Sequence, residues 1–257
     1  MNRPEFSDNF DKRYEQFTKE VCEERRHFFS DETLTFLEDL YAYIESGSDN
    51  MFSFEKGFPL YRARSHVFDV IKNTYIPTPY TNENMKPVSN IRSEGRFNSY
   101  NTNVLYLAFS PEIAISEARS DTLAPVSVGE FELSREVKVI DLTKSVGASH
   151  YFFRSKEDDA LATLGSILSR PLDNQHNRGR SYIPIQIISE YFHFEKGVDG
   201  IIYNSQFQGS ESNVKDHKID PKHQDKNICL YDLSSAECKS VDVWKIEQRI
   251  NKVRRNH

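Results

Sequence analysis

The pattern of apolar positions predicts a pair of helices at the N-terminus. In the first helix, apolar residues recur at helical spacing between residues 10 and 22. The second begins near Ser30, carries acidic residues in its first turn and ends at Gly47. The apolar positions are Phe10, Tyr14, Phe17, Val21 and Cys22 in the first helix, and Phe36, Leu37, Leu40, Tyr41 and Ile44 in the second. We therefore expect an N-terminal helical extension, residues 1–50, before a larger domain, residues 51–257.

Short apolar or alternating runs predict strands in the rest of the chain. They cover residues 58–65, 104–108, 126–133, 136–142, 198–203, 227–233 and 238–243. Further helices are predicted at 158–169 and 182–196, with Pro184 in the first turn of the second. Polar stretches predict a linker at 46–57, a long loop at 73–91, a charged excursion at 206–226 and a basic, partly helical tail at 244–257. Because strands and helices do not alternate regularly, the pattern indicates the α+β class with a mixed, mostly antiparallel sheet.

The stretch from residue 92 to 120 combines a loop, a strand and a helix start. A polar loop around Gly95 precedes an apolar run of strand length. A Ser-Pro-Glu sequence follows, which is typical of a helix start because serine caps the helix and proline suits its first position. Arg96, Tyr106 and Glu117 thus fall on three successive elements. We expect them to form a polar cluster at the edge of a sheet.

Composition and missing motifs narrow the function classes. The net charge of −6 over 257 residues disfavours a nucleic-acid binder that relies on overall positive charge. Three cysteines without metal-ligand spacing indicate free thiols in a reducing compartment, and no run is apolar enough to span a membrane, so we expect a cytoplasmic protein. The P-loop, G-x-G-x-x-G, H-E-x-x-H and C-x-x-C motifs are absent. His217 and His223 lie in the charged excursion, which favours a solvated loop over a metal site.

A few polar residues remain as candidates for chemistry. They are Arg62, Arg96, Tyr106, Glu117 and Ser205. Each has a structural explanation when taken alone: an arginine pairs with an acid, a strand tyrosine belongs to the core, and a helix glutamate is solvated. Ser205 lacks a nucleophile elbow, which disfavours a serine hydrolase. The residues leave open a metal-independent ribonuclease, with His66 as its best histidine, and a non-catalytic module that binds a partner through the N-terminal helices.

A resemblance to a known family connects these residues. The motifs that carry it are Leu60-Tyr61-Arg62, Gly95-Arg96-Phe97-Asn98, Leu105-Tyr106-Leu107-Ala108, Ala114 with Glu117, and Gly200-Ile201-Ile202-Tyr203-Asn204-Ser205. Together they resemble the successive motifs of the RES domain family over residues 58 to about 233. The resemblance implies a fold like that of ADP-ribosyltransferase toxins and the degradation of NAD by hydrolysis or phosphorolysis. It also implies a toxin with a cognate antitoxin.

The resemblance implies that the site cleaves the bond between nicotinamide and ribose. Arg62 and Arg96 are expected to bind the phosphates or ribose of NAD, with Arg64 as a substitute for Arg62, because a guanidinium offers forked charged donors. Glu117 is expected to stabilise the positive charge that develops on the ribose. Tyr106 is expected to stack on or hydrogen-bond the nicotinamide side.

Two further residues complete the implied site. Asn98 is expected to bind NAD, and Ser205 to bind the nicotinamide ribose or to help hold the carboxylate. No metal and no cofactor beyond NAD as substrate are expected. Water, inorganic phosphate as a co-substrate, and a macromolecule, which would make the protein an ADP-ribosyltransferase, stay open as acceptors.

The chain departs from compact members of the family in three places. They are the N-terminal helical pair, the proline-containing segment between Arg62 and Gly95, and the charged excursion after Ser205. The expected partners are NAD and a cognate antitoxin or regulatory protein, and a homo-oligomer stays open. Regulation by the extra N-terminal segment within the same chain is a further expectation.

Overall fold

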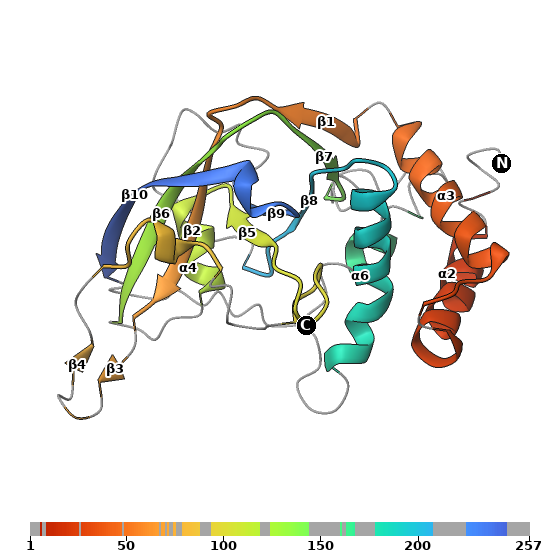
Figure 1. Ribbon diagram of the computed structural model, residues 1–257, viewed down its shortest axis with the longest axis horizontal. Coiled ribbons are helices and arrows are strands. Elements are labelled where there is room, and N and C mark those ends of the chain that lie inside the picture. Colours follow the sequence, from red (N-terminus) through yellow and green to blue (C-terminus); the bar gives the residue numbers. More distant parts are fainter. Residues whose placement is uncertain are drawn as a thin grey trace, which may run out of the picture.

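The α+β class is confirmed by a large sheet with helices packed at its side (Figure 1). The computed structural model describes residues 6, 9–25, 27–47, 49–66, 68–69, 71, 74–75, 79–87, 94–118, 124–143, 160, 163–167, 178–207 and 225–245. Within them the helices include α2 Phe10–Lys19, α3 Asp31–Glu45, α4 Pro111–Glu117 and α6 Arg178–Phe194, with a π-helical turn η1 Glu20–Glu24 and 3₁₀ turns η2 Glu83–Met85 and η5 Leu233–Ser235.

The main sheet is mostly antiparallel, as predicted. Its strands lie in the order β1-β7-β8-β9-β5-β2-β6-β10. Their bounds are β1 Met51–Phe54, β2 Pro59–Ser65, β5 Leu105–Ala108, β6 Pro125–Leu133, β7 Val137–Asp141, β8 Gly200–Asn204, β9 Lys226–Leu230 and β10 Ala236–Lys245. The pair β7 and β8 is parallel, and the other neighbouring pairs are antiparallel. A separate small hairpin joins β3 Phe68–Asp69 to β4 Thr74–Tyr75.

The predicted N-terminal helical pair is present, and a glutamate ties its two helices together. The hydroxyl of Ser30 caps α3 by accepting a hydrogen bond from the backbone N–H of Thr33 at 3.2 Å. Glu20, at the end of the first helix, accepts hydrogen bonds from the backbone N–H and hydroxyl of Ser30 at 2.7 and 2.6 Å and from the hydroxyl of Thr33 at 2.9 Å. The start of α3 is therefore held by a side chain of the preceding helical segment.

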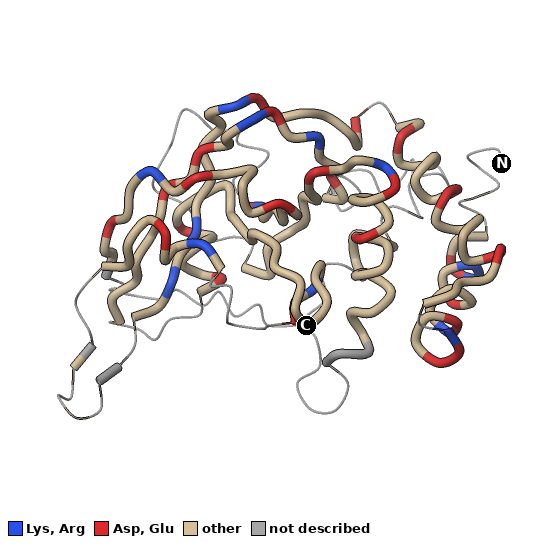
Figure 2. Tube along the Cα trace, viewed as in Figure 1, with Lys and Arg blue, Asp and Glu red and all other residues tan. Residues whose placement is uncertain are grey.

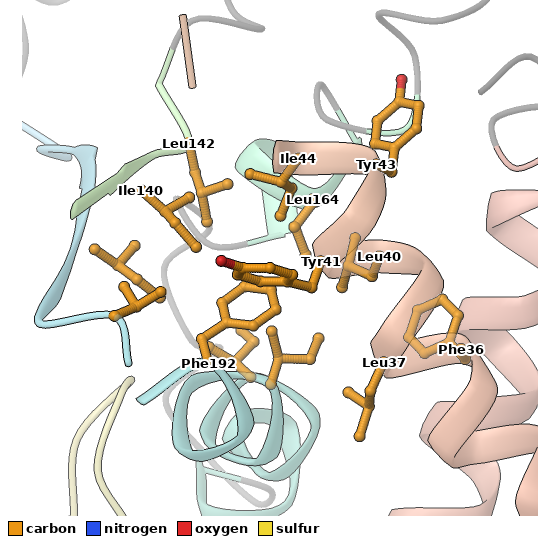
Figure 3. Close-up of a cluster of buried hydrophobic side chains, with 14 of the residues drawn as sticks. Phe36, Leu37, Leu40, Tyr41, Tyr43, Ile44, Ile140, Leu142, Leu164 and Phe192 are labelled. Atoms are coloured by element: carbon orange, nitrogen blue, oxygen red, sulfur yellow. The ribbon is translucent and has the colours of Figure 1, made fainter. Parts of the chain in front are cut away.

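The N-terminal helices share a hydrophobic core with the rest of the chain. In Figure 1, α6 lies between the sheet and the pair α2 and α3. The Tyr41 ring of α3 packs edge-on against Phe192 of α6, with ring centroids 5.8 Å apart (Figure 3). Ile140 and Leu142, from β7 and just after it, belong to the same buried cluster. The cluster crosses the proposed domain boundary at residue 50, and that boundary stays a prediction.

Some predicted boundaries were wrong. The range 46–57, predicted as a linker, contains β1, which pairs with β7 and is too short to show a clear alternation. Trp244 and Lys245, assigned to the tail, end β10 and pair with β6. The helix predicted from residue 182 begins at Arg178, so Pro184 lies inside it and not in its first turn. A proline there removes one intrahelical hydrogen bond.

Other predictions fall partly outside the described residues. The helix predicted for 158–169 is helical at residues 160 and 163–167. The loop at 73–91 contains β4 and η2, and its last residues are not described. In the excursion 206–226, residues 208–224 with both candidate histidines are not described, whereas Lys226 begins β9. The strand predicted for 227–233 ends at Leu230.

Charge and hydropathy add two observations. Acidic and basic positions are interspersed along the described trace (Figure 2), in keeping with a modest net charge of −6. Among the described helices, none combines the length and the apolar character that a bilayer-spanning segment requires.

Candidate active site

The candidate site is a pocket where the main sheet opens. Every residue of β2 pairs with β6, but β2 pairs with β5 only through Tyr61 and Ala108. Because the two strands separate beyond this pair, their side chains enclose a pocket of about 280 Å³. It is lined by Tyr61, Arg62, Ala63, Tyr106, Leu107, Ala108, Ala114, Glu117, Ala118, Tyr203 and Asn227. Three of the predicted site residues thus line one pocket.

Glu117 is the carboxylate of the pocket. It is the last residue of α4, whose start is fixed by the Ser110 hydroxyl, which accepts a hydrogen bond from Ile113 N–H at 3.4 Å, and by a proline at the first position. Its Oε1 accepts hydrogen bonds from the hydroxyl of Ser205 and from Nδ2 of Asn227, both at 2.7 Å. The donors are buried, whereas Glu117 is exposed to solvent. The carboxylate is therefore held by buried donors and remains accessible from solvent.

Arg62 is the cation of the pocket. Its Nη1 donates a hydrogen bond of 2.8 Å to the backbone carbonyl of Met85 in η2. Burial, and to a smaller extent the nearby Arg64, lower the pKa of Arg62 to about 10. The guanidinium is therefore charged at neutral pH but has lost part of its hydration, so an anion in the pocket would find a strong partner.

Arg64, expected as a substitute for Arg62, lies on the same strand but does not line the pocket. Its guanidinium lies 4.8 Å from the centre of the Tyr80 ring, and its Nη1 donates to the backbone carbonyl of Asn84. Both arginines of β2 thus hold the segment around η2, and of the two only Arg62 also faces the pocket.

Tyr106 contributes its ring to the pocket and its hydroxyl to the loop beside it. The hydroxyl accepts a hydrogen bond from Phe97 N–H and donates one to Asn98 Oδ1, both at 2.9 Å. Burial raises the pKa of Tyr106 well above its usual value, so the phenol stays neutral. A Cβ at Gly95 would lie 2.4 Å from Asn98 Oδ1 and 2.6 Å from the Tyr106 hydroxyl. The loop therefore needs glycine at this position to admit the hydroxyl.

The loop residues Asn98 and Arg96 contact two tyrosines that line the pocket. Asn98 is buried, and its Nδ2 donates to the Thr102 carbonyl at 2.8 Å. The Arg96 guanidinium lies 5.4 Å from the centre of the Tyr203 ring, which lines the pocket. Neither loop residue lines the pocket itself, so among the described residues both act on it through an adjacent tyrosine.

Besides the predicted site residues, three other residues with polar side-chain groups line the pocket. They are Tyr61, Tyr203 and Asn227. Tyr61 and Tyr203 stand inside the motifs Leu-Tyr-Arg and Gly-Ile-Ile-Tyr-Asn-Ser, which was the available signal. Asn227 is 2% exposed and precedes an apolar run, a pattern that also describes an ordinary strand end.

The alternative sites receive no support from this geometry. His66, the candidate base of a ribonuclease, is buried, and its Nε2 lies 2.8 Å from the hydroxyl of Ser127. It does not line the pocket. The described part of the chain holds no group of three or more His, Cys, Asp or Glu residues placed to bind a metal ion.

Comparisons with known proteins place the chain in a family. A solved structure described as the M. tuberculosis MbcT–MbcA toxin–antitoxin complex is similar at 12% sequence identity and a TM-score of 0.41, covering 81% of this chain and 93% of that chain. A comparison with curated proteins found no match. The RES domain pattern matches residues 59–245, which include every strand and helix that lines the pocket. Because this match covers more than half of the 257 residues, the chain belongs to the RES domain family.

Proposed function

We propose that this protein degrades NAD by cleaving the bond between nicotinamide and ribose. The observation that carries the proposal is the pairing of an accessible carboxylate, Glu117, with a partly dehydrated guanidinium, Arg62, in one pocket with aromatic walls. NAD offers a matching set of groups: a cationic ring, a ribose that becomes cationic when the bond breaks, and two phosphates.

Glu117 acts on the ribose. When nicotinamide leaves, the ribose becomes oxocarbenium-like, and a fixed negative charge beside it stabilises that state. Two donated hydrogen bonds hold Oε1 and leave Oε2 for the substrate. Glu117 is solvent-exposed before binding, so the bound substrate itself would exclude water from this face.

Arg62 binds the anionic part of the substrate. One N–H reaches the Met85 carbonyl, and a guanidinium has further donors in a rigid fork for phosphate or ribose oxygens. Arg96 and Asn98 support this site from the loop by holding Tyr203 and Tyr106.

The size of the pocket favours one end of the dinucleotide. Its 280 Å³ lies at the lower limit of small-molecule sites, which run from about 300 to 1,000 Å³. We assign it to nicotinamide and its ribose, between the rings of Tyr61, Tyr106 and Tyr203. The adenosine end would then extend beyond the pocket.

The family resemblance supports two acceptors, water and inorganic phosphate, and a biological role. Water would give ADP-ribose, and inorganic phosphate would give ADP-ribose 1″-phosphate. The proposed role is that of a cytoplasmic toxin that depletes NAD, with a cognate antitoxin as partner. Modification of a macromolecule is the alternative, and it predicts ADP-ribose attached to protein or nucleic acid.

A product assay tests the proposal. Purified protein is incubated with NAD, with and without phosphate, and nicotinamide and the ADP-ribose products are separated by chromatography. We expect equal amounts of NAD lost and nicotinamide released, and a loss of kcat of ~100-fold or more in Glu117→Gln, the range seen when one charge-stabilising group is removed. Intact NAD in the wild-type reaction, or undiminished turnover by Glu117→Gln, would refute the proposal.

A further inference from the structure

The carboxylate of Glu117 has a second anchor that the sequence motifs do not include. Asn227 Nδ2 donates to Oε1 at 2.7 Å, the same distance as from the Ser205 hydroxyl. We infer that Asn227 is a positioning residue, which with Ser205 fixes the Glu117 carboxylate so that Oε2 is presented to the substrate. This inference rests on the proposed function.

The fold brings the two anchors together from neighbouring strands. Asn227 lies on β9 and pairs with Tyr203 of β8, and Ser205 follows β8 directly. Both anchors are buried, at 2% and 3% exposure. Asn227 is part of the sheet and Ser205 directly follows one of its strands, whereas Glu117 ends a short helix and its side chain is exposed. The rigid side of the contact is therefore the sheet, and the carboxylate is the group that is held.

The hydrogen-bond directions are determined by the surrounding donors. Ser205 Oγ accepts a hydrogen bond from Phe207 N–H at 3.1 Å, so its own proton is free to point to Glu117. Asn227 must turn its NH₂ toward the carboxylate, because the opposite orientation would place two acceptor oxygens 2.7 Å apart. Both donors therefore point to the same carboxylate oxygen, Oε1. Among the described residues no group bonds to Oε2.

Two hydrogen bonds restrict the rotation of the Glu117 carboxylate more than one would. A carboxylate held by a single hydrogen bond can still rotate about its last torsion, which is broad for glutamate. The hydroxyl and the amide approach Oε1 from different elements and restrict this rotation. A displacement of about 1 Å at the reacting group is sufficient to cost ~100-fold in rate. The loss expected from removing Asn227 is therefore in kcat, because the phosphate contacts of Arg62 are unaffected.

The test measures kcat and KM for NAD in Asn227→Ala, in Glu117→Gln and in the double variant. We expect Asn227→Ala to lose ~10- to 100-fold in kcat, the size of one hydrogen bond to a charged group, with KM changed by less than about threefold. In the Glu117→Gln background the same change should cost nothing further. Equal losses in both backgrounds, or an unchanged kcat, would overturn the inference.

Controls separate positioning from folding and from failure of the proposed function. Asn50→Ala removes another buried asparagine, which directly precedes β1 and lies outside the pocket, and should leave kcat unchanged. Thermal unfolding is measured for every variant. If Asn227→Ala is unfolded at the assay temperature, Asn227→Leu, which keeps the branched shape but has no donor, takes its place with the same expected result. Absence of NAD turnover in the wild type would refute the proposed function, whereas an active wild type with an equally active Asn227 variant refutes only the positioning role.

Discussion

The glycine of the loop beside the pocket allows a sharp test of how that loop is built. The backbone at Gly95 is outside the left-handed region, so alanine meets no backbone strain there. The added Cβ would nevertheless lie 2.6 Å from the Tyr106 hydroxyl and 2.4 Å from Asn98 Oδ1, and both atoms would have to move. The movement breaks the two hydrogen bonds of the tyrosine hydroxyl. At about 1 kcal/mol for each net hydrogen bond, Gly95→Ala should cost about 2 kcal/mol of unfolding free energy.

Thermal unfolding measures this cost. For a chain of this size about 2 kcal/mol corresponds to a fall in melting temperature of roughly 4–8 °C. In the Tyr106→Phe background the two hydrogen bonds that Gly95→Ala would break are already absent, so the added cost of Gly95→Ala should fall to half or less. The same cost in both backgrounds would show that the loop is not organised around the hydroxyl. Gly57→Ala is the control, because its Cβ meets nothing within 4 Å and only its φ of +86° is unfavourable. It should lose stability but keep NAD turnover.

Further predictions concern charge. Arg62→Ala should raise KM for NAD by ~10-fold or more with a smaller effect on kcat. Arg62→Lys should recover only part of the lost affinity, because lysine keeps the charge but lacks the forked donors of the guanidinium. An unchanged KM in steady-state assays would contradict this role. Since the pKa of Arg62 is lowered only to about 10, the wild-type KM should show no change from this residue between about pH 6 and 9. Glu20→Ala should cost about 1–2 kcal/mol in chemical unfolding, because Ser30 and Thr33 lose their shared acceptor. Burial raises the pKa of Glu20, but the hydrogen bonds from these residues outweigh it and hold the pKa below its usual value. The contribution should therefore be present at neutral pH, disappear as the pH falls through the lowered pKa, and be absent from the variant at all pH values.

Local sequence signals were sufficient to predict the helix and the strand that carry Glu117 and Tyr106. The Ser-Pro-Glu sequence predicts the start of α4, the helix that carries Glu117, and the apolar run places Tyr106 on β5. These features depend on capping and on short-range hydrophobic pattern, which act within a few residues. The resemblance to the family then predicted that Arg62 and Glu117 belong to one site, which no local rule contains.

The pocket itself could not be predicted from local patterns. It exists because β2 and β5 pair through one residue pair and then separate, which depends on the register of strands far apart in the sequence. The anchoring of Glu117 by Asn227 likewise joins residues 110 positions apart. An asparagine before an apolar strand has the same appearance whether it ends a strand or holds a carboxylate, so only the tertiary structure distinguishes the two.

The position of the N-terminal helices bears on how regulation within the chain would work. In Figure 1 they lie on the far side of α6 from α4, β2 and β5, so they do not cover the pocket. They contact α6 through Tyr41 and Phe192, and on the same helix Gln186 donates to the carbonyls of Gly95 and Asn98 at 2.8 and 2.9 Å. One route from these helices to the site therefore runs through α6 to the loop that holds Tyr106, and an effect along this route would change the shape of the pocket instead of blocking its entrance.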